Sequence, residues 1–220
     1  MDAIGLEQEC MHSSKVKKMS SLLLKLDLKK AYDKVNWSFM RMVLIQIGLK
    51  WVVVQWIMGC ISSANFAILV SGSPTGFFKG FRGLRQGCLL LPLLFLLFVK
   101  CLSRILKKAK AEGQFKGLKV SIGMVITHFL FVDDVLILAP SSLEEWIVLK
   151  DLLNFFYIAS GMEVNCQKSC FLHNNIEQEI LDKFHDLFGI LLVHLHCGMK
   201  YLGFFLKPND YKISDWRGLI

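Results

Sequence analysis

The stretch Phe129-Leu130-Phe131-Val132-Asp133-Asp134-Val135-Leu136-Ile137-Leu138 places two adjacent carboxylates between two runs of strand-forming apolar residues. This pattern predicts a β-hairpin with Asp133 and Asp134 at its tip. A two-residue hairpin turn favours Asn-Gly or Asp-Gly, because its central residues need positive φ, so Asp-Asp is a poor choice for turning alone. We therefore expect the pair to have a second role besides making the turn.

The chemistry of that role follows from the two charges. Neighbouring carboxylates repel each other, which raises a pKa unless a cation lies between them. Hard oxygen ligands on a rigid turn suit Mg²⁺. A solvated turn is the ordinary explanation of an Asp-Asp pair, but strands as apolar as these are buried, so the turn lies at the rim of a core. A third carboxylate brought close would make a metal site.

Length and composition bound the class of protein. The 220 residues suffice for one sizeable core or for one large domain with a subdomain. The chain is 54% hydrophobic, with a mean hydropathy of +0.46, so a membrane span is the obvious competitor. The longest nearly uncharged apolar stretch, Gln86 to Val99, contains Pro92 and is shorter than the roughly 20 residues that cross a bilayer. We expect a buried helix there and no membrane partner.

The N-terminal residues and the cysteines indicate an intracellular, reducing environment. Met1 to Ser20 lacks the apolar core of a secretory signal, and the seven cysteines are odd in number and have no framework spacing, which favours free thiols without a disulfide partner. The net charge of +8 and the pI near 9.1 are compatible with a polyanionic partner, and favour nucleic acid over a membrane surface only modestly.

A first strand is expected over Ser21 to Leu28. Its leucines at positions 24, 26 and 28 would share one face, with Lys25 and Asp27 on the other, so Asp27 would emerge near the strand end. A basic, glycine-rich loop, Lys79 to Gly87, would let backbone approach a ligand closely.

The remaining pattern predicts an α+β fold, because strands and helices do not alternate strictly. Asn36 would cap a helix that ends before Gly48, and Ser141 or Ser142 with Glu144 or Glu145 would make a capping box. The helix that follows this capping box would run to about Ser160. The other helices are expected at Trp51–Ile61, Leu90–Lys110 and Ile176–Phe188. The other strands are expected at Asn65–Ser71, within Phe115–Ile126, within Glu163–Leu172, and at Met199–Leu206.

Five stretches, in order, now combine. They are Leu24-Lys25-Leu26-Asp27-Leu28-Lys29-Lys30-Ala31-Tyr32-Asp33-Lys34-Val35; Arg82-Gly83-Leu84-Arg85-Gln86-Gly87-Cys88 with Pro92-Leu93-Leu94-Phe95; Phe131-Val132-Asp133-Asp134; Ser160-Gly161-Met162-Glu163-Val164-Asn165 with Lys168-Ser169; and Lys200-Tyr201-Leu202-Gly203. Together they resemble the reverse transcriptases of retrotransposons without long terminal repeats, the LINE-like elements common in plants, from about Leu22 to Trp216.

The resemblance implies an RNA-directed DNA polymerase with a palm fold, an antiparallel sheet packed on helices, with partial fingers and no thumb. Two Mg²⁺ ions would lower the pKa of a primer 3′-hydroxyl, align a deoxynucleoside triphosphate and neutralise the leaving pyrophosphate. Asp27 and Asp133 would bridge the ions, Asp134 would be the third carboxylate, and the backbone carbonyl of Leu28 an extra ligand.

Other roles carry over from the family in the same way. Tyr32 would lie under the sugar and reject a 2′-hydroxyl, although an amphipathic core tyrosine is its ordinary explanation. Lys168 would protonate pyrophosphate as a general acid, although a lysine beside a turn is most often a surface charge. The nucleotide-binding loop residues would be Arg85, Gln86 and Gly87. The primer-holding residues would be Tyr201, Leu202 and Gly203, against ordinary strand packing.

The implied partners are an RNA template, a DNA primer and deoxynucleoside triphosphates, in a protein that is part of a longer polyprotein in intact relatives and acts in the nucleus. We predict that residues 1–20 are an extension left from the fingers region and that residues 21–220 are the palm core with part of the fingers. This chain departs from the family at three positions. It has Leu89 where the family has Pro, Leu91 where the family has Ser, and Val132 where the family has Ala.

Two other classes of function stay open. The chain could be a truncated, inactive retrotransposon remnant that at most binds nucleic acid through its basic charge. It could also be an unrelated metal-dependent nuclease or structural metal protein. The position of Asp27 distinguishes this class from a polymerase, because the polymerase interpretation fails if Asp27 does not lie beside Asp133. A zinc site is not expected, because the spacing fits no paired Cys-x-x-Cys pattern. The residues concerned are Cys166, Cys170, His173, His194, His196 and Cys197.

Overall fold

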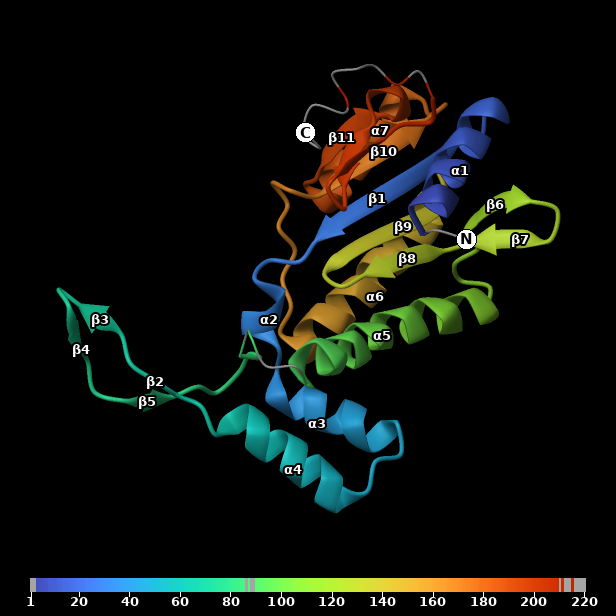
Figure 1. Ribbon diagram of the computed structural model, residues 1–220. Helices are drawn as coiled ribbons and strands as arrows, with labels where there is room; N and C mark the ends of the chain where they lie inside the picture. The colour runs from blue at the N-terminus through green and yellow to red at the C-terminus, as the bar shows by residue number, and fades with distance from the viewer. Residues whose placement is uncertain (1–2, 86, 88–89, 210, 212–214, 216–220) are drawn as a thin grey trace. The chain divides into compact units, whose positions relative to one another are not determined.

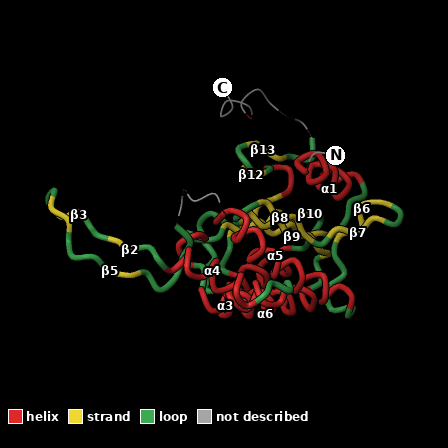
Figure 2. Tube along the Cα trace, turned by 60° about the horizontal axis from the view of Figure 1, so that its bottom comes forward, coloured by secondary structure: helices red, strands yellow, loops and turns green. Residues whose placement is uncertain are grey.

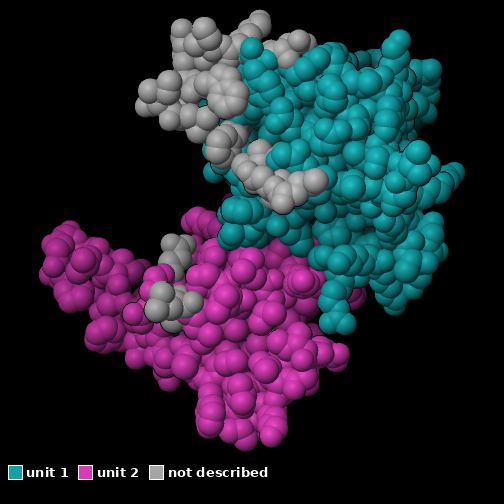
Figure 3. All heavy atoms as spheres, turned by 45° about the vertical axis from the view of Figure 1, so that its right-hand side comes forward, with its two compact units in different colours: residues 1–28, 103–153, 164–220 teal, residues 29–102, 154–163 magenta. Residues whose placement is uncertain are grey.

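The computed structural model describes residues 3–85, 87, 90–209, 211 and 215. The chain forms two compact units, coloured separately in Figure 3. Unit 1 comprises residues 1–28, 103–153 and 164–220, and unit 2 comprises residues 29–102 and 154–163. Each unit is therefore built from segments that are far apart in the sequence.

A five-stranded sheet organises unit 1 (Figure 1). Its strands are ordered β11 (Leu191–His194), β10 (Cys170–Asn174), β1 (Ser21–Asp27), β9 (Asp134–Pro140) and β8 (His128–Phe131). The neighbours pair antiparallel, except that β11 runs parallel to β10. The mixed α+β fold with a largely antiparallel sheet agrees with the predicted class.

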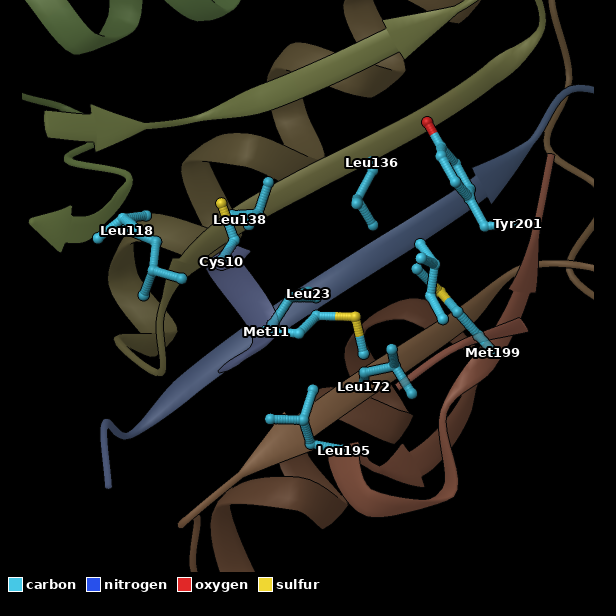
Figure 4. Close-up of a cluster of buried hydrophobic side chains, with 12 residues drawn as sticks. Cys10, Met11, Leu23, Leu118, Leu136, Leu138, Leu172, Leu195, Met199 and Tyr201 are labelled. Carbon is cyan, nitrogen blue, oxygen red and sulfur yellow. The ribbon is translucent and has the colours of Figure 1, made fainter. Parts of the chain in front are cut away.

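Strand β1 is central and buried on both faces, since Leu22, Leu23 and Leu24 are each 0% exposed. The side chains of β1 alternate as predicted, but each face of the strand packs against a core, and neither face is exposed to solvent. On one face, α1 (Ala3–Val16) and two hairpins cover the sheet (Figure 4). The residues labelled in that cluster are Cys10, Met11, Leu23, Leu118, Leu136, Leu138, Leu172, Leu195, Met199 and Tyr201.

Helices α6 (Leu143–Ser160) and α7 (Gln178–Phe188) supply the core of the other face; Figure 2 shows α6 on the opposite side of the strands from α1. The Trp146 ring packs edge-on against Phe171 and Phe184, with centroids 5.2 and 5.9 Å away. The carboxylate of Glu145, a residue of the predicted capping box, accepts a hydrogen bond from the backbone N–H of Lys116 at 3.0 Å.

Two short hairpins flank this sheet. The first joins β6 (Leu118–Ser121) to β7 (Met124–Ile126), and the second joins β12 (Met199–Tyr201) to β13 (Phe204–Leu206). The single strand predicted over Met199–Leu206 is therefore wrong. Leu202 and Gly203 turn the chain with φ of 50° and 82°, the left-handed values that a tight hairpin turn requires. A short 3₁₀ turn, η1 (Leu195–Cys197), precedes this hairpin.

Unit 2 is mostly helical. It contains α2 (Ala31–Lys34), α3 (Trp37–Gln46), α4 (Trp51–Ser62), the first part of α5 (Leu90–Ala111) and the end of α6. The side-chain oxygen of Asn36 accepts hydrogen bonds from the N–H groups of residues 38 and 39, at 2.8 and 3.1 Å, so the predicted N-cap is confirmed. Aromatic rings from α3, α5 and α6 form its core, at positions 39, 98 and 156.

A two-stranded arm follows α4. Its ladders are β2 (Asn65–Phe66) with β5 (Phe78–Lys79) and β3 (Leu69–Val70) with β4 (Ser73–Pro74). The strand predicted over Asn65–Ser71 is thus interrupted. Within the described part of the chain, no helix is both long and apolar enough to cross a membrane.

Candidate active site

The predicted hairpin forms at one end of the unit 1 sheet, but its turn is one residue earlier than the expected Asp-Asp pair. Phe131 of β8 and Asp134 of β9 are paired, so Val132 and Asp133 make the turn. Val132 has φ of 55°, a left-handed conformation that is strained for a β-branched residue. The geometry therefore holds Asp133 on the turn and Asp134 at the first position of β9.

Asp27 lies beside this hairpin. The antiparallel pairing of β1 with β9 ends with Asp27 opposite Asp134, at the last position of the register. Directly opposite residues in an antiparallel pair have Cβ atoms about 4.5–5.5 Å apart. A carboxylate more than one hundred residues upstream is therefore brought to the same end of the sheet as the acidic pair.

The electrostatics of Asp134 reflect this crowding. Burial raises the pKa of Asp134, and the negative charges of Asp133 and Asp27 raise it further. The ammonium of Lys25, 4.0 Å from the Asp134 Oδ1, opposes both effects and holds that pKa lower than it would otherwise be. The protein has concentrated negative charge here and supplies one nearby cation of its own.

Lys25 also connects the acidic cluster, which consists of Asp27, Asp133 and Asp134, to the β12–β13 hairpin. Its Nζ donates a hydrogen bond to the backbone carbonyl of Lys200 at 2.8 Å and lies 6.0 Å from the centre of the Tyr201 ring. Sequence reasoning assigned no role to Lys25. The available signal was its position two residues before Asp27, which places both side chains on one face of a strand.

The backbone around Asp27 is fixed by the segment 164–169. The Asp27 N–H donates to the Ser169 hydroxyl at 3.0 Å, and the N–H of Asn165 donates to the Asp27 carbonyl at 2.9 Å. Leu28 forms an isolated bridge with Val164. Ser169 is 1% exposed, so its hydroxyl is positioned by the core, whereas the neighbouring Lys168 is exposed.

Three carboxylates offer the hard oxygen donors that Mg²⁺ prefers, and burial together with the charges of Asp133 and Asp27 raises the pKa of Asp134. As the side chains stand in the described residues, no group of three or more histidines, cysteines, aspartates or glutamates is arranged to hold a metal ion. The His194 ring stacks on that of His196, with centroids 4.9 Å apart, and meets the His173 ring edge-on, with centroids 5.1 Å apart.

The predicted nucleotide-binding residues belong to unit 2. The Tyr32 ring stacks on Phe95, with centroids 4.4 Å apart and an interplanar angle of 20°, which fixes its orientation. Arg85 is exposed, and Gly87 has φ of 90° with open space where a Cβ would lie. The predicted contact from Gln86 lies outside the described residues.

The predicted primer-holding residues differ in exposure. The Tyr201 ring is 1% exposed and packs in the core, where burial and the nearby Glu7 carboxylate raise the pKa of its hydroxyl. Gly203 is exposed at the hairpin turn and Leu202 is half-buried. The turn, and not the tyrosine ring, is the accessible part of this segment.

One protein family matches most of the chain. The family described as reverse transcriptase (RNA-dependent DNA polymerase) matches residues 2–206. An uncharacterized mitochondrial protein of Arabidopsis thaliana is 40% identical over 67 residues, which is 30% of this chain and 55% of that protein. The assignment to LINE-like elements stays a prediction.

Solved structures of telomerase share the fold. Telomerase from Candida tropicalis in complex with a fragment of telomeric RNA superposes with a TM-score of 0.60 at 16% identity, covering 95% of this chain and 32% of that one. The Candida albicans enzyme gives 0.62 at 12% identity, with 93% and 32% covered. This chain thus spans about a third of the telomerase chains it matches. With a family match over residues 2–206, the chain belongs to the reverse transcriptase (RNA-dependent DNA polymerase) family.

Proposed function

We propose that unit 1 carries the catalytic centre of an RNA-directed DNA polymerase, in which Asp27, Asp133 and Asp134 serve nucleotidyl transfer to a primer 3′-hydroxyl. The observation that carries this proposal is the pairing of Asp27 with Asp134 across β1 and β9, beside Asp133 on the turn. A carboxyl group whose pKa is raised by burial and by neighbouring carboxylates, as that of Asp134 is, is typical of functional sites. An isolated Asp-Asp turn would have no such third partner.

Asp27 and Asp133 would hold two Mg²⁺ ions, with Asp134 and the carbonyl of Leu28 as further ligands. When bound, the ions would lower the pKa of the attacking hydroxyl and neutralise the pyrophosphate. The chain's own part is positioning: the hydrogen bonds from Asp27 to Ser169 and from Asn165 to Asp27 fix the backbone that carries the first carboxylate. Phosphoryl transfer depends mainly on such positioning and on electrostatics.

The substrate contacts follow the family resemblance. Lys168, exposed on the segment that clamps Asp27, would protonate the leaving pyrophosphate. The turn at Leu202 and Gly203 would contact the primer, and Arg85 the nucleotide. Tyr32, fixed by its stack on Phe95, would exclude a 2′-hydroxyl. An RNA template, a DNA primer and deoxynucleoside triphosphates are the partners that these roles require.

Primer extension on an RNA template with Mg²⁺ and deoxynucleoside triphosphates tests the proposal. Asp27→Asn and Asp134→Asn should each lower the extension rate about 10³-fold, because lost metal ligation removes several kcal/mol of transition-state stabilisation. Asp151→Asn is the matched control, since that carboxylate is exposed on α6. Equal activity in all four proteins would refute the assignment.

Metal binding gives a readout that does not depend on turnover. Mn²⁺ should broaden the NMR signals of the β8–β9 turn and of Asp27 in the original chain, and much less in Asp27→Asn. Broadening without extension would indicate an inactive remnant with a preserved metal site. Absence of both would contradict the metal assignment itself.

A further inference from the structure

A polar cavity of about 500 Å³ lies within unit 2, and its lining includes no residue that was assigned a catalytic, nucleotide-binding or primer-binding role above. It is bounded by the N-terminal turn of α3, by α4 and by the segment that follows β5. The residues that carry the argument are Lys34, Ser38, Arg41, Ser62, Phe81 and Arg82. We propose that this pocket binds a nucleoside monophosphate, a planar base that carries one phosphate.

The charge of the pocket selects an anion. Three of its side chains are cationic, and no residue that the structure describes in its lining is a carboxylate. Lys34 pairs with the Glu163 carboxylate, so its charge is already compensated. Arg41 and Arg82 have no carboxylate within ion-pair distance among the described residues, and each lies over an aromatic ring instead. The Arg82 charge also lowers the pKa of Glu163, so that carboxylate compensates it in part. Both guanidinium groups line the same space.

Guanidinium groups favour phosphate over other anions. Their planar fork can donate two parallel hydrogen bonds to one phosphate, and such charge-assisted bonds are about twice as strong as neutral ones. The positive end of the α3 macrodipole adds to the potential at this end of the pocket. Ser38 and Ser62 are exposed hydroxyls that can donate to the remaining phosphate oxygens or to a sugar.

The aromatic residues account for the base. The Phe81 side chain is 79% exposed, with the Arg82 guanidinium 5.4 Å from its centre. Exposed aromatic rings beside arginines are platforms on which bases stack. Trp37 lines the pocket with its indole N–H committed to the carbonyl of Gly83 at 2.7 Å, which fixes the ring. A volume of about 500 Å³ is within the range of small-molecule sites.

Calorimetric titration of the whole chain with AMP, in the presence of EDTA, tests the proposal. We expect saturable binding with a Kd below about 1 mM, weakened about 10-fold or more in Arg82→Gln and in Arg41→Gln. Arg104→Gln, which removes an exposed arginine of α5 outside the pocket, should bind AMP like the original chain. Circular dichroism of each variant checks that it is folded.

Ligand fragments and a local probe sharpen the test. Adenosine and inorganic phosphate should each bind at least about 10-fold more weakly than AMP, since each satisfies half of the site. The indole N–H signal of Trp37, identified by its loss in Trp37→Phe, should shift during the AMP titration. A 5′-phosphorylated dinucleotide that binds as tightly as AMP would identify a strand end as the source of the ligand, and one that does not would identify the free nucleotide.

Three results would overturn the proposal. The first is the absence of saturable AMP binding by the folded chain. The second is equal weakening by Arg104→Gln, which would indicate unspecific attraction to net charge. The third is loss of binding in Arg85→Gln with none in Arg82→Gln, which would place AMP on the nucleotide-binding loop predicted for the polymerase.

Discussion

Replacing Lys25 by Met should destabilise the fold and should do so through Asp134. Among the residues that the structure describes, the Lys25 ammonium is the only cation in an ion pair with the acidic cluster, 4.0 Å from the Asp134 Oδ1. It also donates to the carbonyl of Lys200 at 2.8 Å. The substitution removes both interactions while keeping most of the volume of the side chain.

The magnitude follows from the geometry. Unit charges 4 Å apart attract by about 4 kcal/mol at the effective dielectric constant of a protein surface, before desolvation is subtracted. Exposed pairs contribute about 0–1 kcal/mol in practice. The two side chains are 15% and 21% exposed, so the pair lies between a surface and a buried one. We expect a coupling energy of about 2 kcal/mol, with about 1 kcal/mol more for the lost hydrogen bond.

Urea unfolding of four proteins measures that coupling: the original chain, Lys25→Met, Asp134→Asn and the double variant. Lys25→Met should lower the free energy of unfolding by about 3 kcal/mol in the original chain, but by only about 1 kcal/mol in a chain that already carries Asp134→Asn. Lys119→Met is the control, because this lysine is exposed on β6 and should change stability by less than about 0.5 kcal/mol.

The pH dependence adds an independent check. The pKa of Asp134 is raised in the folded state, so its ionised form opposes folding at neutral pH and that penalty is lost as the pH falls through the raised value. Lys25 lowers this pKa, so Lys25→Met enlarges the penalty at neutral pH and its cost should shrink on acidification. A coupling below about 0.5 kcal/mol, or one that is unchanged by acid, would refute the reasoning.

Three further outcomes are expected. Val132→Asn should stabilise the chain by about 1 kcal/mol, because Asn tolerates the φ of 55° at that turn. Val125→Asn, the control on β7, should destabilise the chain, and thermal unfolding compares the two variants. His128, whose pKa burial lowers to about 4, should be neutral above that pH in NMR titration. Since its unfolded pKa is about 6.5, stability should fall by about 2–3 kcal/mol as the pH drops from 6.5 towards 4, and His128→Gln should remove this loss. Gly161→Ala should lower the free energy of unfolding by about 2 kcal/mol or more, because φ is 78° and a Cβ would lie 2.7 Å from a backbone oxygen. Gly59→Ala, in open space on α4, should raise it by about 0.5–1 kcal/mol, and urea unfolding measures both changes.

Local patterns in the sequence predicted the elements that carry the chemistry. The alternation over Ser21–Leu28 predicted β1, and Asn36 predicted the start of α3. The acidic hairpin followed from two apolar runs around Asp133 and Asp134. These signals succeed because each depends on residues within a few positions of one another.

The misses depend on contacts between distant parts of the chain. The parallel strand β11 (Leu191–His194) pairs with β10 only in the folded sheet, and α1 (Ala3–Val16) covers a core whose other members lie mostly more than one hundred residues away. The roles of Lys25 and Ser169 belong to the same class. Their partners are Asp134 and the Asp27 backbone, and no local pattern connects them.

The core itself sets the register of the candidate site. A slip of one residue between β1 and β9 would place Leu23 and Leu138, which are paired and 0% exposed, on opposite faces of the sheet. That same register places Asp27 opposite Asp134. The apolar pairs along both strands therefore keep three repelling carboxylates together, and the stability that the acidic cluster costs is supplied by the buried leucines on which its geometry depends.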